Sequence, residues 1–434
     1  MKSCARPSLS PSQMKQIRTI EHLDTIVHIP GSKSITHRYL IMAALAGGKS
    51  QLRNTLWCDD TRYTAKALES LGAEIIHAPE AAEVSGTGGK LDHPARPIFL
   101  DNAGTSMRLL TAVACLAQGD CVLTGSERMH KRPIGELLAG LRPLGGVVES
   151  LDKNGCPPVH IHGKGLKGGR TLVDASRSSQ FVSAILLAAP YAANPVEIEV
   201  QGLVSRPYVD VTLDGMSRFG AVAGWLDEET LRVEAPGHYR PGNYDVEGDC
   251  SSASYFWAAA AITGGKITTL NIVRDSNQGD LAFLELLSQM GCRVEWHDHG
   301  VTVRGGRLKG IEVDMRDMPD MVPTLAVAAA FAEGTTVIGN VGHLRIKESD
   351  RLQAVAEGLQ RLDVQVDEGQ DSLTIKGGSP VGALIDPHND HRIAMSFAVV
   401  GLVTRGVRIA DETCVDKSFP EFWDRFEELY ESRK

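Results

Sequence analysis

Residues 31 to 48, GSKSITHRYLIMAALAGG, indicate the architecture of the chain, because the same kind of segment occurs six times. Each copy opens with small polar residues and continues into an Ala-rich apolar run, which predicts a turn that leads into a buried helix. The copies lie 69 to 73 residues apart, so one supersecondary unit is repeated. The other five copies are NAGTSMRLLTAVACLAQG from Asn102, SRSSQFVSAILLAAP from Ser176, GDCSSASYFWAAAAITGG from Gly248, MPDMVPTLAVAAAFAEG from Met318 and HNDHRIAMSFAVVGL from His388.

A second helical pattern follows most copies and closes on a glycine, as in TAKALESLG at Gly72 and LAFLELLSQMG at Gly291. Glycine suits a helix C-cap. Strand-like runs such as AEIIHA (73–78) and CRVEWHD (292–298) come next, and others such as TIVHI (25–29) precede a copy. The unit is therefore strand, helix, strand, helix and two strands, and the fold class is α/β. The small apolar faces predict that the first helix of each unit is buried in a bundle.

Composition limits the classes of function. The 434 residues carry a formal charge of -9, and only 5% are aromatic, which argues against a nucleic-acid partner. The eight cysteines form no CxxC pair and indicate reduced thiols in the cytoplasm. We find no apolar run of signal-peptide or membrane-spanning length, and hence expect a cytoplasmic protein without a membrane partner.

Cations gather at the predicted helix starts and in nearby loops, although the helix dipole disfavours a cation there. Singly each reads as a solvated surface charge; jointly they indicate a ligand with several phosphate or carboxylate groups. They are Lys33, Arg38, Arg108, Arg128, Lys131, Arg132, Lys347, Arg351, Arg392 and Lys417.

The segment RIKESDRL, residues 345 to 352, is the densest cluster of charge. If it is helical, Lys347 and Arg351 share a face and Glu348 is three residues from Arg351. Two interpretations stay open: a surface helix with weak ion pairs, or a carboxylic acid beside an anion clamp, as proton transfer requires.

Other helix-start residues are equally ambiguous. Asp390 fits an ordinary N-cap, whereas Asp320 fits that role less well because it follows a proline in an apolar segment. Gly104 is either a turn glycine or a point where a ligand approaches the backbone. The chain has no HExxH, Walker A or GxGxxG motif in the required context, so neither a metal nor a cofactor is expected.

Together these passages resemble the 3-phosphoshikimate 1-carboxyvinyltransferase (EPSP synthase) family of enolpyruvyl transferases. The resemblance rests on PGSKSITHR, DNAGTSMR, GSERMHKRPIG, SRSSQF, LVSRPYVD, EGDCSSASYF, IKESDRL, NDHRIAMSF and KSFPEF, from Pro30 to Phe422. It implies an inside-out α/β barrel of two similar domains, each of three βαβαββ units. One domain would span 32–246; the other would be discontinuous, 1–31 with 247–434, with one unit completed by the N-terminus. The active site would lie in the cleft between them.

The resemblance also implies the reaction, which transfers the enolpyruvyl group of phosphoenolpyruvate to the 5-hydroxyl of shikimate 3-phosphate and releases phosphate. It implies catalytic roles for Lys33, Asp320 and Glu348, with Asp320 as base and Glu348 exchanging a proton with the methylene carbon. The implied shikimate 3-phosphate site is Lys33, Ser34, Arg38, Ser178, Ser179, Gln180, Ser205, Tyr208, Asp320 and Lys347. The implied phosphoenolpyruvate site is Lys33, Asn102, Gly104, Thr105, Arg132, Gln180, Arg351, His391, Arg392 and Lys417.

The family is metal-free and monomeric, and we expect inhibition by glyphosate in competition with phosphoenolpyruvate. Two positions depart from the family pattern: His343 stands where Asn is usual, and Leu109 follows Arg108 where Pro is common. One alternative is UDP-N-acetylglucosamine 1-carboxyvinyltransferase, whose loop cysteine is missing from residues 126–133 and whose Lys-Asn is replaced by Lys33-Ser34. The other is a repeat protein that binds anionic metabolites without turnover.

Overall fold

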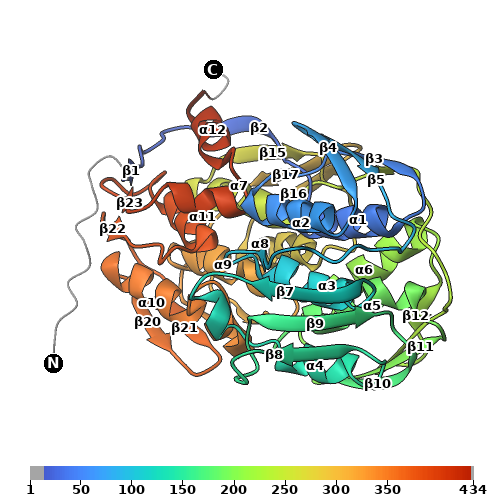
Figure 1. Cartoon of the computed structure of the whole chain (residues 1–434). Helices are drawn as coiled ribbons and strands as arrows, with labels where there is room; N and C mark the ends of the chain where they lie inside the picture. The colour runs from blue at the N-terminus through green and yellow to red at the C-terminus, as the bar shows by residue number, and fades with distance from the viewer. Residues whose placement is uncertain (1–13, 432–434) are drawn as a thin grey trace. The chain divides into compact units, whose positions relative to one another are not determined.

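The computed structural model describes residues 14–431, and the chain forms two compact units. The first unit comprises Ile29–Cys250 together with Asn271–Leu281. The second comprises residues 14–28, Ser251–Leu270 and residues 282–431. Figure 1 follows these segments from the blue N-terminal strands to the red C-terminal helices.

The first unit contains three four-stranded sheets. Its elements are α1 (Lys33–Leu45), β3 (Lys49–Arg53), α2 (Asp59–Ser70), β4 (Glu74–Ala78), β5 (Ala81–Ser85), β6 (Ile98–Phe99), α3 (Gly104–Ala114), β7 (Gln118–Thr124), α4 (Gly135–Leu141), β8 (Val147–Ser150), β9 (Val159–Lys164), β10 (Gly169–Asp174), α5 (Gln180–Ala188), β11 (Val196–Gln201), α6 (Pro207–Arg218), β12 (Ala223–Trp225), β13 (Thr230–Val233) and β14 (Asn243–Asp245). Within one sheet, β6 and β7 run parallel, and β7, β9 and β8 continue antiparallel side by side (Figure 1).

The second unit repeats this plan twice and then a third time in a shorter form. Its elements are β1 (Lys15–Gln16), β2 (Asp24–His28), α7 (Cys250–Thr263, entered from the first unit), β15 (Lys266–Leu270), α8 (Phe283–Met290), β16 (Arg293–His297), β17 (Gly300–Arg304), β18 (Glu312–Asp314), α9 (Val322–Ala329), β19 (Thr335–Gly339), α10 (Arg351–Arg361), β20 (Gln365–Glu368), β21 (Leu373–Lys376), β22 (Leu384–Ile385), α11 (His391–Val400), β23 (Arg408–Ile409) and α12 (Phe422–Glu427). The predicted strand and helix order is confirmed, and the chain has the α/β fold of repeated βαβαββ units.

Two βαβαββ repeats exchange their first strands. The strand before α1 is β2, but it pairs in parallel with β15, whereas β14, the strand before α7, pairs in parallel with β3. The N-terminal strand β1 pairs antiparallel with β23 and completes the three-stranded sixth sheet. The chain therefore enters the first unit after His28 and leaves it after Cys250, and it returns there only for Asn271–Leu281.

The two crossing segments pair with each other inside the first unit. Gly31 and Gly248 form an isolated antiparallel bridge. The Asn54 side chain donates to the Val246 carbonyl at 2.6 Å. A Cβ on Gly31 would lie 1.7 Å from the Asn54 carbonyl oxygen, so only glycine fits at this close approach.

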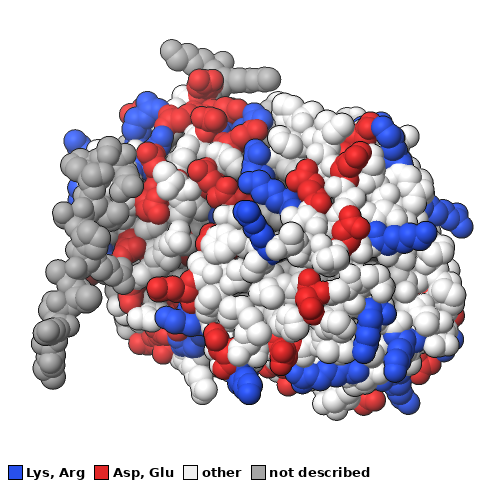
Figure 2. All heavy atoms as spheres, viewed as in Figure 1, with Lys and Arg blue, Asp and Glu red and all other residues white. Residues whose placement is uncertain are grey.

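The first helix of each βαβαββ repeat lies in the core of its compact unit. Every residue of α1 from Ile35 to Leu45 is buried, α3 packs against α5, and α9 packs against α11. Small side chains let these helix backbones come close together, which confirms the expected buried bundles. Gly72 and Gly291 end their helices with φ of 102° and 112°, a conformation that favours glycine. Acidic and basic side chains are interspersed on the face shown in Figure 2.

Candidate functional site: two charged clusters

Lys33 lies in the first turn of α1, where its side chain and its backbone N–H each contact one acidic residue. Its Nζ is 3.1 Å from Asp60 Oδ2, and its backbone N–H donates to Asp249 Oδ2 at 2.9 Å. The helix dipole opposes a cation at this position, and the two carboxylates offset that cost. Asp60 is itself 2% exposed, so Lys33 is fixed against a buried anion.

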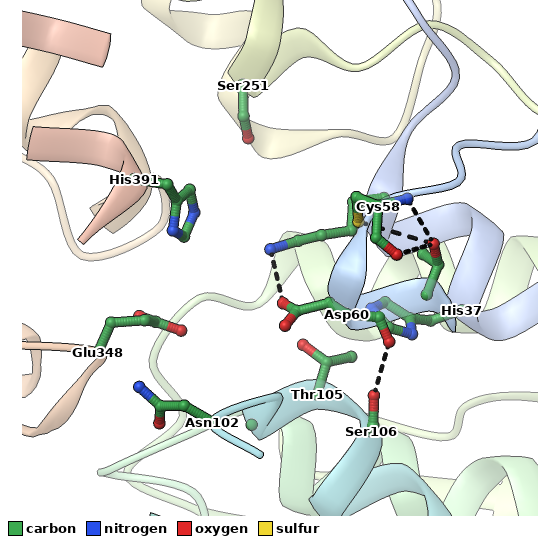
Figure 3. A network of polar contacts seen from close by, with 12 residues as sticks. His37, Cys58, Asp60, Asn102, Thr105, Ser106, Ser251, Glu348 and His391 are labelled. Atoms are coloured by element: carbon green, nitrogen blue, oxygen red, sulfur yellow. Dashed lines mark hydrogen bonds and ion pairs between the residues drawn. The ribbon is translucent and has the colours of Figure 1, made fainter. Parts of the chain in front are cut away.

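A network of hydrogen bonds through two hydroxyl groups and one imidazole holds the Asp60 backbone in place. Ser106 Oγ donates to the Asp60 carbonyl at 3.1 Å (Figure 3). The Ser106 and Thr64 hydroxyl oxygens are 2.8 Å apart, and His37 Nδ1 is 2.7 Å from Thr64 Oγ1. This network joins α1, α2 and α3, so the position of the Lys33 ammonium depends on all three helices.

Arg38 is a completely buried cation whose partners are neutral. Its guanidinium donates to Thr212 Oγ1 at 2.8 Å, to the Ser34 carbonyl at 2.8 Å and to the Tyr208 carbonyl at 3.0 Å. Burial lowers the pKa of Arg38 to about 10, and the group is still charged at neutral pH. Within residues 14–431 no carboxylate pairs with it. A buried cation of this kind favours an anionic ligand.

The turn before α3 is built around Arg132. Its guanidinium is almost fully buried and donates to the Asn102 carbonyl at 3.0 Å and to Asn102 Oδ1 at 3.1 Å. A Cβ added to Gly104 would lie 2.5 Å from Arg132 Nη2 and 2.8 Å from Arg108 Nη1. The glycine at this position therefore leaves room for two guanidinium groups beside the turn.

Gln180, at the start of α5, joins two of these elements. Its Nε2 donates to Thr105 Oγ1 at 3.0 Å, and its Oε1 accepts from Arg108 Nη1 at 3.0 Å. Arg108 also donates to the Pro133 carbonyl at 3.3 Å, next to Arg132 in sequence. The structure thus brings together Gln180 and Thr105, which the sequence predicted as site residues, through Arg108, which it had noted only as a cation.

The serines stand at the starts of two neighbouring helices. Ser178 and Ser179 precede α5, where Ser178 Oγ accepts from the Gln180 backbone N–H at 3.2 Å. Ser205 precedes α6 and has a φ of 56°, which is unusual for a residue other than glycine. Tyr208 lies one turn further, and its hydroxyl is 3.5 Å from Asp280 Oδ2. Since α5 and α6 are in contact, these residues occupy one region of the first unit.

The second cluster lies entirely in the second unit and centres on Arg351. Arg351 Nη1 donates to Asp320 Oδ1 at 2.8 Å, and Arg392 Nη2 donates to Asp320 Oδ2 at 2.7 Å. Burial alone would raise the pKa of Asp320, but Arg392, Arg351 and Lys347 hold it below its ordinary value. Asp320 is therefore a bridging carboxylate between two guanidinium groups.

Two further acids fix the other edges of Arg351. Asp390 accepts from Arg351 Nε at 2.8 Å and from Nη2 at 3.2 Å, and it also accepts from Ser349 Oγ at 3.0 Å. Glu348 Oε2 accepts from Arg351 Nη2 at 2.8 Å. Although burial alone would lower the pKa of Arg351, Asp390, Glu348 and Asp320 raise it above its ordinary value. These hydrogen bonds fix the orientation of the Arg351 guanidinium group, which stays charged at every pH at which the protein would work.

The remaining predicted residues of this unit lie around the same helices. His391 is the first residue of α11 and is buried, with Nδ1 3.9 Å from Asp390 Oδ1. Burial, followed by the charge of Lys347, lowers the pKa of His343 to about 4, so this side chain is neutral at pH 7. Lys417 ends a short 3-10 helix that contacts α11.

The structure answers whether the segment RIKESDRL is helical, which the sequence left open. Residues 345–352 do not form one helix: a 3-10 turn ends at Ile346, and α10 begins at Arg351. Asp350 caps α10 by accepting from the Gln353 N–H at 3.1 Å, and a residue with that role lies outside the helix. The pairing of Glu348 with Arg351 is nevertheless present, and Arg351 is buried instead of solvated. Asp390 is an N-cap, as its ordinary interpretation predicted, whereas Asp320 is not.

Sequence analysis missed Asp60, Thr212 and Ser183, which hold Lys33 and Arg38. Asp60 looked like an ordinary acid in the first turn of a helix. Only the spacing of Thr212 from Tyr208, four residues on α6, could have placed that hydroxyl on the same face. Among residues 14–431, no group of His, Cys, Asp and Glu side chains is arranged to hold a metal ion, and no helix is both long and apolar enough to cross a membrane.

The chain was compared with families, curated proteins and solved structures. The family model described as EPSP synthase (3-phosphoshikimate 1-carboxyvinyltransferase) matches residues 17–426. A 3-phosphoshikimate 1-carboxyvinyltransferase of Syntrophobacter fumaroxidans is 46% identical over 419 residues, covering 96% of this chain and 99% of the relative. One from Methanosphaerula palustris is 48% identical over 407 residues, covering 93% and 96%.

Among solved structures, EPSP synthase from Acinetobacter baumannii matches with a TM-score of 0.82 and 30% identity. This match covers 96% of the present chain and 98% of that structure. Sequence and fold therefore agree over almost the whole length. The chain belongs to the EPSP synthase (3-phosphoshikimate 1-carboxyvinyltransferase) family.

Proposed function

We propose that this protein transfers the enolpyruvyl group of phosphoenolpyruvate to the 5-hydroxyl of shikimate 3-phosphate, the shikimate-pathway step that leads towards aromatic amino acids. The observation that carries this proposal is the family match over residues 17–426, supported by relatives of 46% and 48% identity. The two charged clusters also support it, because each contains guanidinium groups that can bind an anion, and both substrates carry a phosphate and a carboxylate.

In this proposal the first unit holds most of shikimate 3-phosphate. Arg38 and Ser34 bind its carboxylate, which is the charge that the buried Arg38 guanidinium needs. The 3-phosphate lies at the helix starts that carry Ser178, Ser179 and Ser205, where backbone N–H groups and hydroxyls converge on an anion. Tyr208 and Gln180 lie beside the ring.

In this proposal phosphoenolpyruvate uses residues from both units. Lys33, Arg132 and Lys417 bind its phosphate, with Asn102, Gly104, Thr105, Gln180 and His391 around it. Arg351 and Arg392 bind the carboxylate, because their guanidinium groups already share one carboxylate, that of Asp320.

The chemistry is an addition followed by an elimination. In the addition, the 5-hydroxyl oxygen bonds to carbon 2 of phosphoenolpyruvate, Asp320 accepts the hydroxyl proton, and Glu348 gives a proton to the methylene carbon. Lys347 binds the ring hydroxyls with Asp320. In the elimination, Glu348 takes a proton back from the new methyl group and the carbon–oxygen bond to phosphate breaks. The phosphate leaves beside Lys33 and carries away the proton that Asp320 accepted from the hydroxyl.

We further propose that the protein works as a cytoplasmic monomer and that glyphosate competes with phosphoenolpyruvate. The cytoplasm is supported by the cysteines, since seven of them lie in the described chain and all are unpaired thiols. Burial raises the pKa of Cys58 to about 11, so even the thiol near Lys33 stays protonated at neutral pH.

The test is phosphate release from phosphoenolpyruvate, run in parallel with shikimate 3-phosphate and with UDP-N-acetylglucosamine. Release with shikimate 3-phosphate alone supports the proposal. Release with the sugar nucleotide would assign the chain to the alternative transferase, against which the family matches already weigh. Binding of both anions without release in either mixture would favour a non-catalytic binding protein.

A further inference from the structure

We propose that Asp320 and the carboxylate of phosphoenolpyruvate compete for the same pair of guanidinium groups, Arg351 and Arg392. This inference rests on the proposed function and adds how the site is regulated. We call these two guanidinium groups the carboxylate clamp. Asp320 would occupy the clamp in the absence of ligand, and phosphoenolpyruvate would bind only when the Asp320 carboxylate leaves it.

The geometry of the clamp matches that of a bound carboxylate ligand. The two oxygens of Asp320 accept from two different arginines, at 2.8 Å from Arg351 Nη1 and 2.7 Å from Arg392 Nη2. A substrate carboxylate that bridges both arginines needs the same two N–H groups. The two carboxylates therefore cannot make these bonds together.

Of the three side chains, Asp320 is the one that a ligand could displace. Its side chain is 19% exposed, against 2% for Arg351 and 7% for Arg392. Arg351 cannot turn to serve both carboxylates, because Asp390 accepts from its Nε and Nη2, and Asp390 is completely buried. The Nη1 edge of Arg351 is the edge on which an exchange can occur.

The charges of the cluster favour an exchange over a simple addition. Arg351, Arg392 and Lys347 supply three positive charges, and Asp320, Glu348 and Asp390 supply three negative charges. A substrate carboxylate would add one uncompensated negative charge to this buried group. Loss of Asp320 from the clamp restores the balance around the arginines.

The exchange would also prepare Asp320 for proton transfer. The groups that face it are Arg392, Arg351, Lys347, Glu348 and the neutral His343. The arginines keep the pKa of Asp320 too low for an effective base. Once they bind the substrate carboxylate, the pKa of Asp320 rises towards the ordinary range. Because the ring hydroxyls of shikimate 3-phosphate would donate to Asp320, that substrate would weaken the competition and promote phosphoenolpyruvate binding.

Calorimetry on the full chain tests the competition. We expect wild-type protein to bind phosphoenolpyruvate weakly without shikimate 3-phosphate, and Asp320→Asn to bind it at least about tenfold more tightly, since one charge-assisted bond is worth ~1.5–3 kcal/mol. In this variant shikimate 3-phosphate should no longer tighten phosphoenolpyruvate binding. Asp320→Glu keeps the charge and should bind as weakly as wild type.

Glu348→Gln is the matched control, because it removes one negative charge from Arg351 without freeing Arg392. It should change the affinity less than threefold. If Glu348→Gln and Asp320→Asn bind phosphoenolpyruvate equally more tightly, the effect is one of net charge and the proposal is wrong. Unchanged affinity in Asp320→Asn would also overturn it. Wild-type phosphate release reports the proposed function separately: release without tightening refutes only the competition. Absence of both release and phosphoenolpyruvate binding in every form refutes both.

Discussion

Gly104→Ala places one methyl group against two cations of the first unit. The new Cβ would lie 2.5 Å from Arg132 Nη2, 2.6 Å from Arg132 Cζ and 2.8 Å from Arg108 Nη1. Ordinary contact begins at 3.4 Å, so the Arg132 guanidinium must retreat by about 0.9 Å, which is 3.4 minus 2.5. The end of an arginine side chain can make this shift, and the fold should survive.

The shift affects ligands that use Arg132. Moving a guanidinium group by about 1 Å weakens a charge-assisted hydrogen bond worth ~1.5–3 kcal/mol. That loss corresponds to roughly ten- to hundredfold in affinity. In the proposed site both phosphoenolpyruvate and glyphosate bind at Arg132, so the KM for phosphoenolpyruvate and the Ki for glyphosate should both rise, while the KM for shikimate 3-phosphate stays within about twofold.

Steady-state phosphate release with varied phosphoenolpyruvate and glyphosate measures both constants. Gly224→Ala is the matched control, because nothing lies within 4 Å of a Cβ at that position in β12. It should leave both constants unchanged. A Gly104→Ala protein with glyphosate and phosphoenolpyruvate constants within twofold of wild type would show that this turn does not shape the anion site.

Three further changes test other parts of the structure. His343→Asn should make the free energy of unfolding less dependent on pH. Burial lowers the pKa of His343 to about 4 from 6.5, so between these values the unfolded chain binds a proton that the folded chain does not. Folding stability of the wild type therefore falls as pH drops from 6.5 towards 4. Urea unfolding should show wild type losing about 2 kcal/mol more than the variant between pH 7 and pH 5; parallel curves would contradict this. Thr212→Val leaves the Arg38 Nε donor unpaired and should raise the KM for shikimate 3-phosphate about tenfold with kcat nearly unchanged, whereas a loss of kcat alone would contradict that role. Gly358→Ala gains roughly 1 kcal/mol of helix propensity but puts a Cβ 2.4 Å from the Phe397 ring, and overpacking of roughly 1–3 kcal/mol should lower the Tm; a higher Tm would mean that the ring moves freely.

The repeat made the local structure predictable. The polar-to-Ala segments begin helices, the glycines at the ends of the second helices have positive φ, and the short β-branched runs are strands. Each of these features depends on a few neighbouring residues, and the sixfold repetition gives six independent readings of one pattern. For the segment from Arg345 to Leu352 the sequence left two interpretations open, because its charges have helical spacing although the helix begins only after Asp350.

The βαβαββ unit and the side chains at the helix starts follow from local sequence pattern. The exchange of β2 and β14 between sheets, the ion pair of Lys33 with Asp60, and the Asp320 bridge between Arg351 and Arg392 became visible only in the folded chain. Periodicity reports the conformation of a residue and its near neighbours. A pairing across tens or hundreds of residues depends instead on how the helices pack, because packing alone brings those charged groups within hydrogen-bond distance.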